Sequence, residues 1–293
     1  MRILLTGKNG QVGHELQHLL PSLGTVVALG REELDLTSAD AIRKTMRDVR
    51  PGIVVNAAAY TAVDLAEQEP DKAFAINGTA PGLIAEEARR TDAFVVHYST
   101  DYVFDGSQKT PYLETDMPNP LSAYGHSKVA GENAIRASGA AHFIFRTSWI
   151  YAAHGRNFVH TILRLARERD ELKIVDDQIG APTWARTVAE TTCAALKAQY
   201  RDRSGLYHLT AAGSVTWFGF AKAILDEAKT LQPDLRMPAL IPISTSEYPL
   251  PTPRPANSCL DNTRLHTTLG LFTPDWPVSL TQCMREILSP CGN

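Results

Sequence analysis

A tyrosine and a lysine near the middle of the chain have the spacing of a proton-donating pair. Tyr124 and Lys128 are four residues apart, so a helix places both side chains on one face. A phenol has an unperturbed pKa of about 10, and a neighbouring ammonium group favours the phenolate and lowers that pKa. Such a tyrosine can give a proton to a carbonyl oxygen while hydride reaches the carbonyl carbon. The pair therefore predicts carbonyl reduction, although an ordinary surface pair on a helix has the same spacing.

The segment before this pair supplies further hydroxyl groups. Ser99 and Thr100 follow an apolar run, and the active sites of doubly wound folds lie at the carboxyl ends of strands. Hydroxyl groups there can bind a substrate carbonyl and hold it against Tyr124. A turn that is merely rich in Ser, Thr and Asp is the alternative. The presence of both Tyr124 and Lys128 favours a site.

A glycine-rich loop near the N-terminus indicates a dinucleotide site. Gly7, Gly10 and Gly13 lie between an apolar run and an amphipathic segment, the strand–loop–helix context of a pyrophosphate-binding turn. The helix that follows would offer free N–H groups and a partial positive charge. A plain β–α turn is the alternative. In NAD enzymes an acidic residue at the end of the next strand binds the ribose. This chain has Gly30 and Arg31 there, which favours NADPH. The alternative is that Arg31 is simply a surface residue.

A second motif in the same region points to a different chemistry. His14, Glu15 and His18 match the His-Glu-x-x-His pattern of zinc metalloproteases. No obvious third ligand accompanies the motif, and one face of this helix must pack on the sheet. We therefore interpret the two histidines as partly exposed helix residues rather than as metal ligands.

These residues belong to an alternation of strands and helices. Five continuous apolar runs predict strands at residues 2–6, 25–29, 53–58, 93–99 and 142–148. Helical patterns reach residue 20 after the glycine loop and then cover residues 37–49 behind a capping box, 73–90 and 122–138. Continuous hydrophobicity is typical of parallel strands that helices cover on both faces. The predicted fold class is α/β, with a Rossmann-type doubly wound parallel sheet over residues 1–150.

The second half, residues 151–293, is predicted to be mainly a smaller, interleaved substrate-binding domain. Helical patterns cover residues 157–169 and 183–200, residues 172–175 and 206–209 resemble strands, and Thr216 caps a helix to about residue 231. Gly and Pro are spread through the chain rather than pooled in a linker. Some segments are therefore expected to return to the first sheet, and the proline-dense stretch 238–255 is expected to form one wall of the substrate cleft.

Composition excludes several classes of protein. The 293 residues have a formal net charge of −3 and no dominant basic cluster, which argues against nucleic-acid or membrane-surface partners. No stretch approaches the roughly 20 apolar residues of a membrane helix. Cys193, Cys259, Cys283 and Cys291 are scattered without a Cys-x-x-Cys motif, so neither a zinc site nor a disulfide framework is expected. A reducing cytoplasm is the expected compartment.

With these motifs in place, the chain resembles the dTDP-4-dehydrorhamnose reductases, an extended short-chain dehydrogenase/reductase family. The resemblance covers nearly the whole chain and is most specific at residues 99–106, Ser-Thr-Asp-Tyr-Val-Phe-Asp-Gly. Further matching segments are residues 7–13, 55–64, 145–149, 177–183 and 254–258. It implies reduction of the C4 keto group of a dTDP-6-deoxyhexulose to dTDP-L-rhamnose, a precursor of polysaccharides, with NADPH or NADH as cofactor.

The resemblance also implies roles for particular residues. Tyr124 would donate the proton, Lys128 would tune it and hold the nicotinamide ribose, and Thr100 would orient the keto oxygen. The other implied cofactor-binding residues are Gly7, Gly10, Gln11, Val12, Gly13, Arg31, Asp35, Leu36, Ala59, Tyr60 and Thr61. The implied substrate-binding residues are Thr100, Asp101, Trp149, Asn157, Gln178 and Arg254, the last suited to phosphate oxygens.

Some members of this family are dimers that bind Mg²⁺ through glutamates at the interface. Glu15 and Glu286 fit that pattern, but Arg186 stands where a third glutamate would. Because its positive charge would repel Mg²⁺, we expect the metal site to be absent or reduced. A homodimer is the oligomeric state that the resemblance suggests.

Two other functions were weighed against reduction. The nearest enzyme alternative is a nucleotide-sugar dehydratase or epimerase of the same superfamily. The dehydratases have a glutamate after Thr-Asp at the strand end, whereas here Tyr102 follows Asp101. Elimination would therefore lack its base. Related chains also act as non-catalytic regulatory subunits of a methionine adenosyltransferase, and the set of Thr100, Tyr124 and Lys128 favours an enzyme instead.

Overall fold

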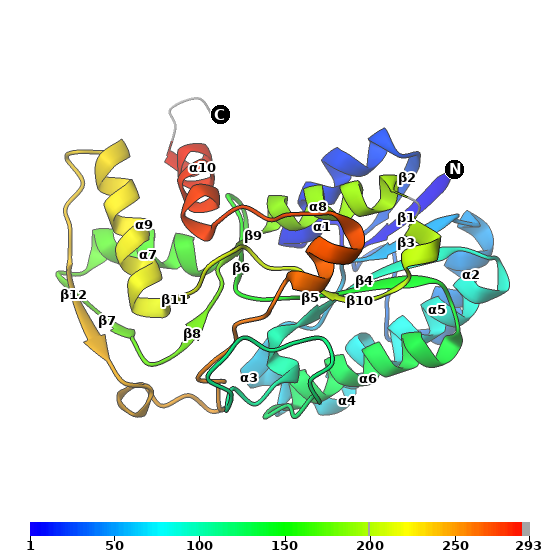
Figure 1. The fold of residues 1–293 in the computed structure, drawn as a ribbon, viewed down its shortest axis with the longest axis horizontal. Helices are drawn as coiled ribbons and strands as arrows, with labels where there is room; N and C mark the ends of the chain where they lie inside the picture. Colours follow the sequence, from blue (N-terminus) through cyan, green and yellow to red (C-terminus); the bar gives the residue numbers. More distant parts are fainter. Residues whose placement is uncertain (199, 289–293) are drawn as a thin grey trace.

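The computed structural model describes residues 1–198 and 200–288, and its centre is a six-stranded sheet (Figure 1). The strands lie in the order β10-β5-β4-β3-β1-β2, and every neighbouring pair is parallel. Their bounds are β1 (Arg2–Thr6), β2 (Thr25–Leu29), β3 (Ile53–Asn56), β4 (Phe94–Thr100), β5 (His142–Thr147) and β10 (Gly205–His208). Because β2 and β3 lie on opposite sides of β1, the chain leaves a crevice at the carboxyl ends of these strands.

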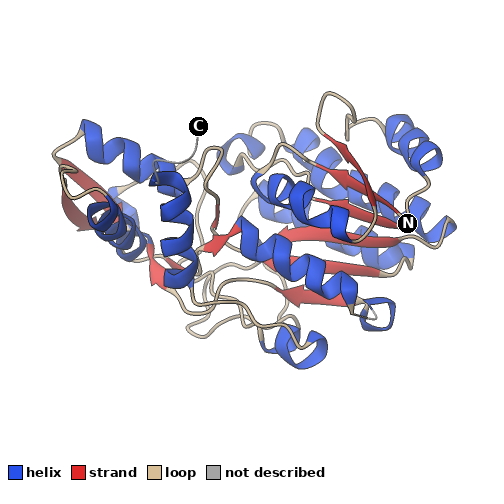
Figure 2. Ribbon diagram, turned by 90° about the horizontal axis from the view of Figure 1, so that it is seen from above, coloured by secondary structure: helices blue, strands red, loops and turns tan. Residues whose placement is uncertain are grey.

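Helices cover both faces of this sheet (Figure 2). One face packs against α1 (Gln11–Leu19) and α8 (Ala185–Lys197), and the other against α2 (Ala39–Val49), α5 (Ala80–Arg90) and α6 (Ala123–Ser138). Every residue of β3 and β4 is buried. Burial on both faces explains the continuous apolar runs of the sequence. The predicted α/β fold with a Rossmann-type parallel sheet is confirmed.

Side chains at the expected positions start the helices. The Ser38 hydroxyl accepts a hydrogen bond from Ala41 N–H at 3.2 Å, and the Ser122 hydroxyl accepts one from Gly125 N–H at 3.0 Å. Such caps satisfy backbone donors that have no partner inside the helix. The second cap matters for function because it fixes the first turn of α6, which carries Tyr124.

A second, smaller core lies beside the sheet, to the left in Figure 1. It is formed by α7 (Phe158–Glu168), α9 (Trp217–Leu231) and α10 (Trp276–Leu288), which bury Phe220 and Met284. Beside these helices β7 (Glu171–Val175) pairs in parallel with β12 (Ala239–Ile243). Between β7 and α9 the chain returns to the first core, where Val188 of α8 and Leu209 after β10 pack with Leu5.

Three segments differ from the sequence-based expectations. Thr183 and Trp184 form β9 (Thr183–Trp184), which pairs with β6 (Ile150–Tyr151), so α8 begins only at Ala185. The proline-dense stretch 238–255 contains β12, a strand that was not expected there. The sequence patterns also missed α10 and η6 (Leu265–Leu269). The remaining short elements are η1 (Leu20–Ser22), α3 (Val63–Ala66), α4 (Pro70–Phe74), η2 (Ala75–Thr79), η3 (Asp101–Val103), β8 (Ile179–Gly180), η4 (Tyr200–Arg203), β11 (Val215–Thr216) and η5 (Thr245–Glu247).

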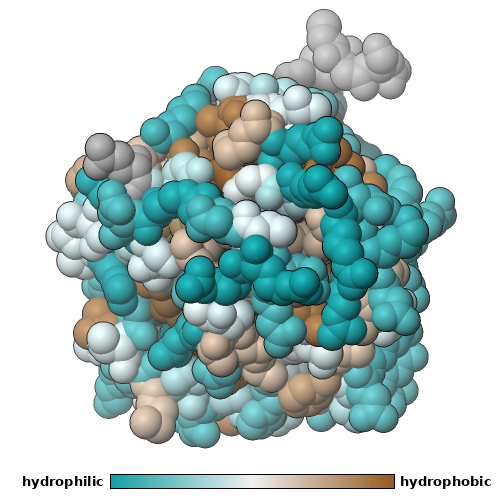
Figure 3. All heavy atoms as spheres, turned by 90° about the vertical axis from the view of Figure 1, so that its right-hand side faces the viewer, coloured by the Kyte–Doolittle hydropathy of each residue, from teal (hydrophilic) through white to brown (hydrophobic). Residues whose placement is uncertain are grey.

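The end of the molecule near β2 and α2 presents mostly hydrophilic side chains with small, scattered apolar patches (Figure 3). Within the described residues, no helix has both the length and the hydrophobicity to cross a membrane. Cys193, Cys259 and Cys283 are buried free thiols, and Cys291 lies outside the described residues.

Candidate active site

A cavity of about 830 Å³ lies at the carboxyl ends of the strands. Most of the residues that the sequence singled out line it: Gly7, Gly10, Gln11, Val12, Arg31, Asp35, Leu36, Ala59, Tyr60, Thr61, Thr100, Asp101, Tyr124, Lys128 and Trp149. The glycine loop and the Tyr/Lys pair, more than 110 residues apart in sequence, thus share one cavity. Gly13, Asn157, Gln178 and Arg254 lie outside its lining.

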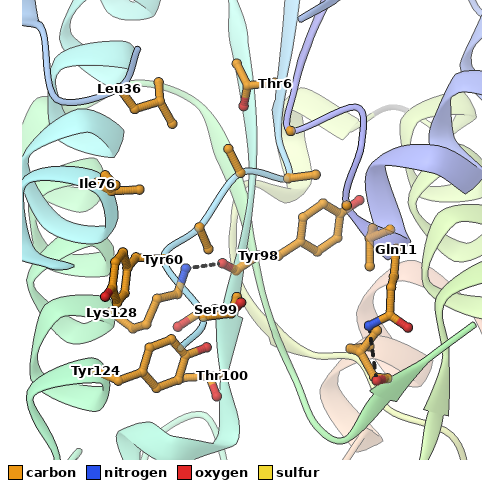
Figure 4. Close-up of a pocket in the computed structure, with 18 of the residues that line it drawn as sticks. Thr6, Gln11, Leu36, Tyr60, Ile76, Tyr98, Ser99, Thr100, Tyr124 and Lys128 are labelled. Carbon is orange, nitrogen blue, oxygen red and sulfur yellow. Dashed lines mark hydrogen bonds between the residues drawn. The ribbon is translucent and has the colours of Figure 1, made fainter. Parts of the chain in front are cut away.

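The Tyr124 and Lys128 side chains project from α6 toward the end of β4 (Figure 4). The helix can lie this close because residue 125 is glycine: a Cβ there would be 2.4 Å from the Tyr102 carbonyl oxygen. Thr100 ends β4, and its hydroxyl donates to Asp101 Oδ1 at 3.0 Å. The phenol, the ammonium group and the strand-end hydroxyl therefore meet at one side of the cavity.

Burial dominates the protonation of these groups. It raises the pKa of Tyr124 to about 12, although a hydrogen bond with the Thr100 hydroxyl acts in the opposite direction. Burial lowers the pKa of Lys128 to about 8, and the charge of Glu132 acts against this shift. Burial also raises the pKa of Asp101 to about 7, and hydrogen bonds with Ser258 and Thr100 act in the opposite direction. Each shift disfavours the charged form of a group in a low-dielectric environment.

A buried ion pair joins α6 to the sheet below the catalytic pair. Glu132, one helical turn beyond Lys128, accepts from Arg146 Nε at 2.9 Å and from Arg146 Nη2 at 2.7 Å. The Ser99 hydroxyl donates to the same carboxylate. Because Ser99 precedes Thr100, these bonds fix the position of α6 relative to the end of β4.

The glycine loop suits an anionic ligand. Gly7 has φ +75°, and a Cβ there would be 2.5 Å from Ala58 N, so the loop packs closely on the segment after β3. The first turn of α1 has neither a side-chain cap nor an acidic residue. Its free N–H groups can therefore bind a pyrophosphate. A Cβ at Gly13 would be 2.0 Å from Gly7 O, so this glycine is required for packing.

The end of β2 holds a carboxylate that the sequence analysis missed. Glu33 Oε2 accepts from Gly30 N–H at 2.8 Å, and Glu33 also pairs with Lys8. Both bonds lower the pKa of Glu33, the one from Lys8 more strongly. Arg31 lines the cavity beside this turn, and Asp35 is held by Thr37. A carboxylate therefore lies at this strand end, three positions beyond the one where an acid was expected, although Glu33 is not among the residues that line the cavity.

Two tryptophans form the opposite wall. Trp149, with φ +46°, stacks on Trp217 with ring centroids 3.4 Å apart and 5° between the planes. Trp217, at the start of α9, and Arg156 also line the cavity and were not predicted. Residues 238–255, which were expected to form a proline-rich wall, are not among the residues that line the cavity. Part of that segment forms β12, which pairs with β7.

The other predicted substrate residues have partners nearby. Asn157 donates to Gln11 Oε1 at 3.0 Å, which links α7 to the glycine loop. Gln178 donates to Thr245 Oγ1 at 3.0 Å. Arg254 donates to Asp64 Oδ1 at 2.9 Å.

The glutamates considered as metal ligands are joined by an arginine. Arg186 Nε donates to Glu15 Oε2 at 2.8 Å, and its Nη1 bonds Glu286. Among the described residues, no group of three or more His, Cys, Asp or Glu side chains could hold a metal ion. His14 and His18 are exposed on α1 with their rings 5.0 Å apart.

Comparisons with known proteins show the family of the chain. The family model described as RmlD substrate binding domain matches residues 1–289. A dTDP-4-dehydrorhamnose reductase of Burkholderia thailandensis is 48% identical over 297 residues, covering 99% of this chain and 100% of that protein. The crystal structure of such a reductase from Clostridium acetobutylicum matches with a TM-score of 0.91 at 38% identity, covering 97% of this chain and 98% of that one. A Bacillus anthracis reductase in complex with NADP matches with a TM-score of 0.89 at 35% identity, covering 97% and 99%. The chain belongs to the RmlD family, in which these dTDP-4-dehydrorhamnose reductases are found.

Proposed function

We propose that the protein is an NADPH-dependent dTDP-4-dehydrorhamnose reductase, which converts dTDP-4-dehydro-L-rhamnose to dTDP-L-rhamnose. The observation that carries the proposal is the meeting of Tyr124, Lys128 and Thr100 in the cavity that also contains the glycine loop. Relatives with this activity in their names match nearly the full length of the chain. A reductase needs a proton donor beside the carbonyl, and it does not need a second acid or base that acts on the sugar.

Tyr124 is the proton donor of the proposed reaction. At neutral pH it holds its proton firmly, because burial raises the pKa of its phenol to about 12. Reduction of the C4 carbonyl generates an alkoxide, whose basicity is sufficient to take that proton. The Lys128 ammonium stabilises the phenolate that remains. The Thr100 hydroxyl, by turning its proton from Asp101 Oδ1 to the keto oxygen, orients that oxygen toward Tyr124.

The cavity suits NADPH, which supplies the hydride when bound. The free N–H groups of α1 at Gln11 and Val12 would hold the pyrophosphate, and Arg31 would lie near a 2′-phosphate. An NADP complex of a relative supports this choice. The Glu33 carboxylate at the same strand end opposes a 2′-phosphate, so NADH is expected to be accepted as a weaker alternative.

Trp149 and Asp101 would contact the sugar nucleotide from the remaining walls of the cavity. Arg254, Gln178 and Asn157 lie outside that lining and would act on the substrate only after a change in their present hydrogen bonds. A guanidinium is the group best suited to a diphosphate, which makes Arg254 the first of the three to test.

We also propose that no magnesium ion is required. Arg186 supplies the positive charge between Glu15 and Glu286, and its guanidinium bonds both carboxylates. A divalent cation at this place would have to displace that guanidinium.

The test is the loss of nicotinamide absorbance with dTDP-4-dehydro-L-rhamnose made in situ, with NADPH and NADH in parallel. We expect oxidation that depends on the keto sugar and is faster with NADPH. Tyr124→Phe should lower turnover by about 10²–10⁴-fold while NADP⁺ still binds, since it removes only the acid. Keto-sugar reduction at the wild-type rate by this variant would refute the role of Tyr124. The absence of oxidation in a wild-type protein that binds both cofactors would refute the substrate.

A further inference from the structure

A row of buried polar side chains runs across the sheet to Lys128. Thr6, Asn56 and His97 lie on β1, β3 and β4, and they are 2%, 1% and 0% exposed. Asn56 Nδ2 is 3.1 Å from His97 Nδ1, and His97 Nε2 is 3.2 Å from Lys128 Nζ. Lys128 itself is 1% exposed and also donates to the Tyr98 carbonyl at 2.6 Å. The proposed mechanism gives His97 no role.

The two hydrogen bonds that Asn56 Oδ1 accepts determine the direction of the others in this row. The Asn56 Oδ1 atom accepts from Ala58 N–H at 3.3 Å and from the Thr6 hydroxyl at 2.6 Å. A backbone N–H can only donate, so the other end of the amide, Nδ2, must face the imidazole. An amide nitrogen has no acceptor to offer, and His97 Nδ1 is therefore the acceptor of that bond.

It follows that His97 carries its proton on the other nitrogen. The ring is neutral, because burial lowers the pKa of His97 well below its ordinary value and the nearby Lys128 charge lowers it further. A neutral imidazole has one N–H, and here it is on Nε2, directed at Lys128 Nζ. A neutral amine can accept this bond through its lone pair, whereas an ammonium group cannot.

We infer that Asn56 and His97 form a positioning device that favours the neutral amine of Lys128 by donating the Nε2–H of His97 to it. The inference rests on the proposed function, in which Lys128 stabilises the Tyr124 phenolate. A lysine that holds its proton loosely can pass a proton on during turnover, and proton transfer is most efficient when the pKa lies near the working pH. His97 is thus a positioning residue that acts through Lys128.

Some ionisable groups facing this site act on Lys128, and others act on His97. Burial is the largest influence on the pKa of Lys128 and lowers it, and Glu132 on α6 raises it. Glu132 is itself paired with Arg146 of β5. His142 at the start of β5 acts on His97, whose pKa it lowers. Tyr124 lies on the same face of α6 as Lys128. The variants below leave all of these groups in place, except for the control.

The experiment is an NMR titration of the free protein with ¹³C-labelled lysine, in which Lys128→Arg assigns the resonance. We expect Lys128 to titrate near pH 8 in the wild-type protein. His97→Leu removes the N–H and should raise the midpoint by about one pH unit, the shift that one net hydrogen bond produces. Asn56→Asp should raise it further. A carboxylate can only accept from the ring, so it favours the tautomer of His97 with its proton on Nδ1, and Nε2 then becomes an acceptor for the ammonium group.

The control is His142→Leu, the same substitution on the neighbouring strand, where the ring bonds only the Ala140 carbonyl. Its titration should match the wild type. Equal midpoints for His97→Leu, Asn56→Asp and this control would overturn the inference. If His97→Leu does not fold, Asn56→Asp decides alone, because it keeps the ring and reverses only its proton. The titration needs no turnover, so it can succeed or fail independently of the proposed substrate.

Discussion

The ion pair between Glu132 and Arg146 should be the most strongly coupled pair of residues beneath the active site. Both side chains are almost fully buried, at 1% and 2% exposure. Glu132→Gln leaves the guanidinium without a counter-charge, and Arg146→Met leaves the carboxylate with the Ser99 hydroxyl as its remaining partner. Removal of one partner from a buried pair costs about 3–5 kcal/mol of unfolding free energy.

The double variant should recover most of this loss. With Glu132→Gln and Arg146→Met together, no charge remains to be desolvated, and replacing both partners of a buried pair is often nearly neutral. We expect the double variant to lose no more than about 2 kcal/mol, less than either single variant. The resulting coupling energy is at least about 4 kcal/mol.

Urea unfolding of the four proteins measures this cycle. The control is Lys44 and Asp48, an exposed pair on α2 with the same combination of charges, whose coupling should stay near about 0.5 kcal/mol. Additive losses for Glu132 and Arg146, or a coupling no larger than that of the control, would refute the reasoning that this site is dehydrated.

Three further predictions concern the reaction itself. Reduction should be fast below pH 8 and slow down as the pH rises through about 8, because Lys128 then loses the charge that stabilises the phenolate. A pH profile of kcat/KM measures this effect, and a flat profile up to pH 10 would contradict it. Chelation with excess EDTA should leave the rate unchanged, since Arg186 already neutralises Glu15; a loss of activity that Mg²⁺ restores would speak against that role. Glu33→Gln should raise the ratio of kcat/KM for NADPH to kcat/KM for NADH about two- to fivefold, which is the effect of one exposed charge. The matched control is Glu32→Gln, at the exposed neighbouring residue. Equal ratios for the two variants would exclude Glu33 as a determinant of cofactor preference.

The sequence predicted the central sheet because burial on two faces produces a local signal. Five strands and the starts of α2, α6, α7 and α9 follow from apolar runs and capping residues. β12 was missed because Pro242 lies within it and its pairing with β7 depends on the second core. Similarly, Thr183 and Trp184 have a helical pattern in the sequence, but they pair with β6 and form a strand.

The candidate site divides in the same way. Gly10, Tyr124 and Lys128 could be found because their spacing expresses their chemistry within one turn or one helix. Glu33 and Trp217 could not, since one reaches Gly30 through a turn and the other meets Trp149 only after the second core has formed. His97 gave no pattern, because its importance comes from partners on two other elements.

The position of β10 at the edge of the sheet bears on how the chain folds as it leaves the ribosome. β5 is complete at Thr147, but the strand that covers its outer edge begins only at Gly205. At the usual rates of synthesis, the intervening roughly 60 residues take about 3–12 s to make. During those seconds the nascent sheet presents an open strand edge, which is a template for pairing with other chains. The edge of β5 therefore needs protection until β10 has been synthesised.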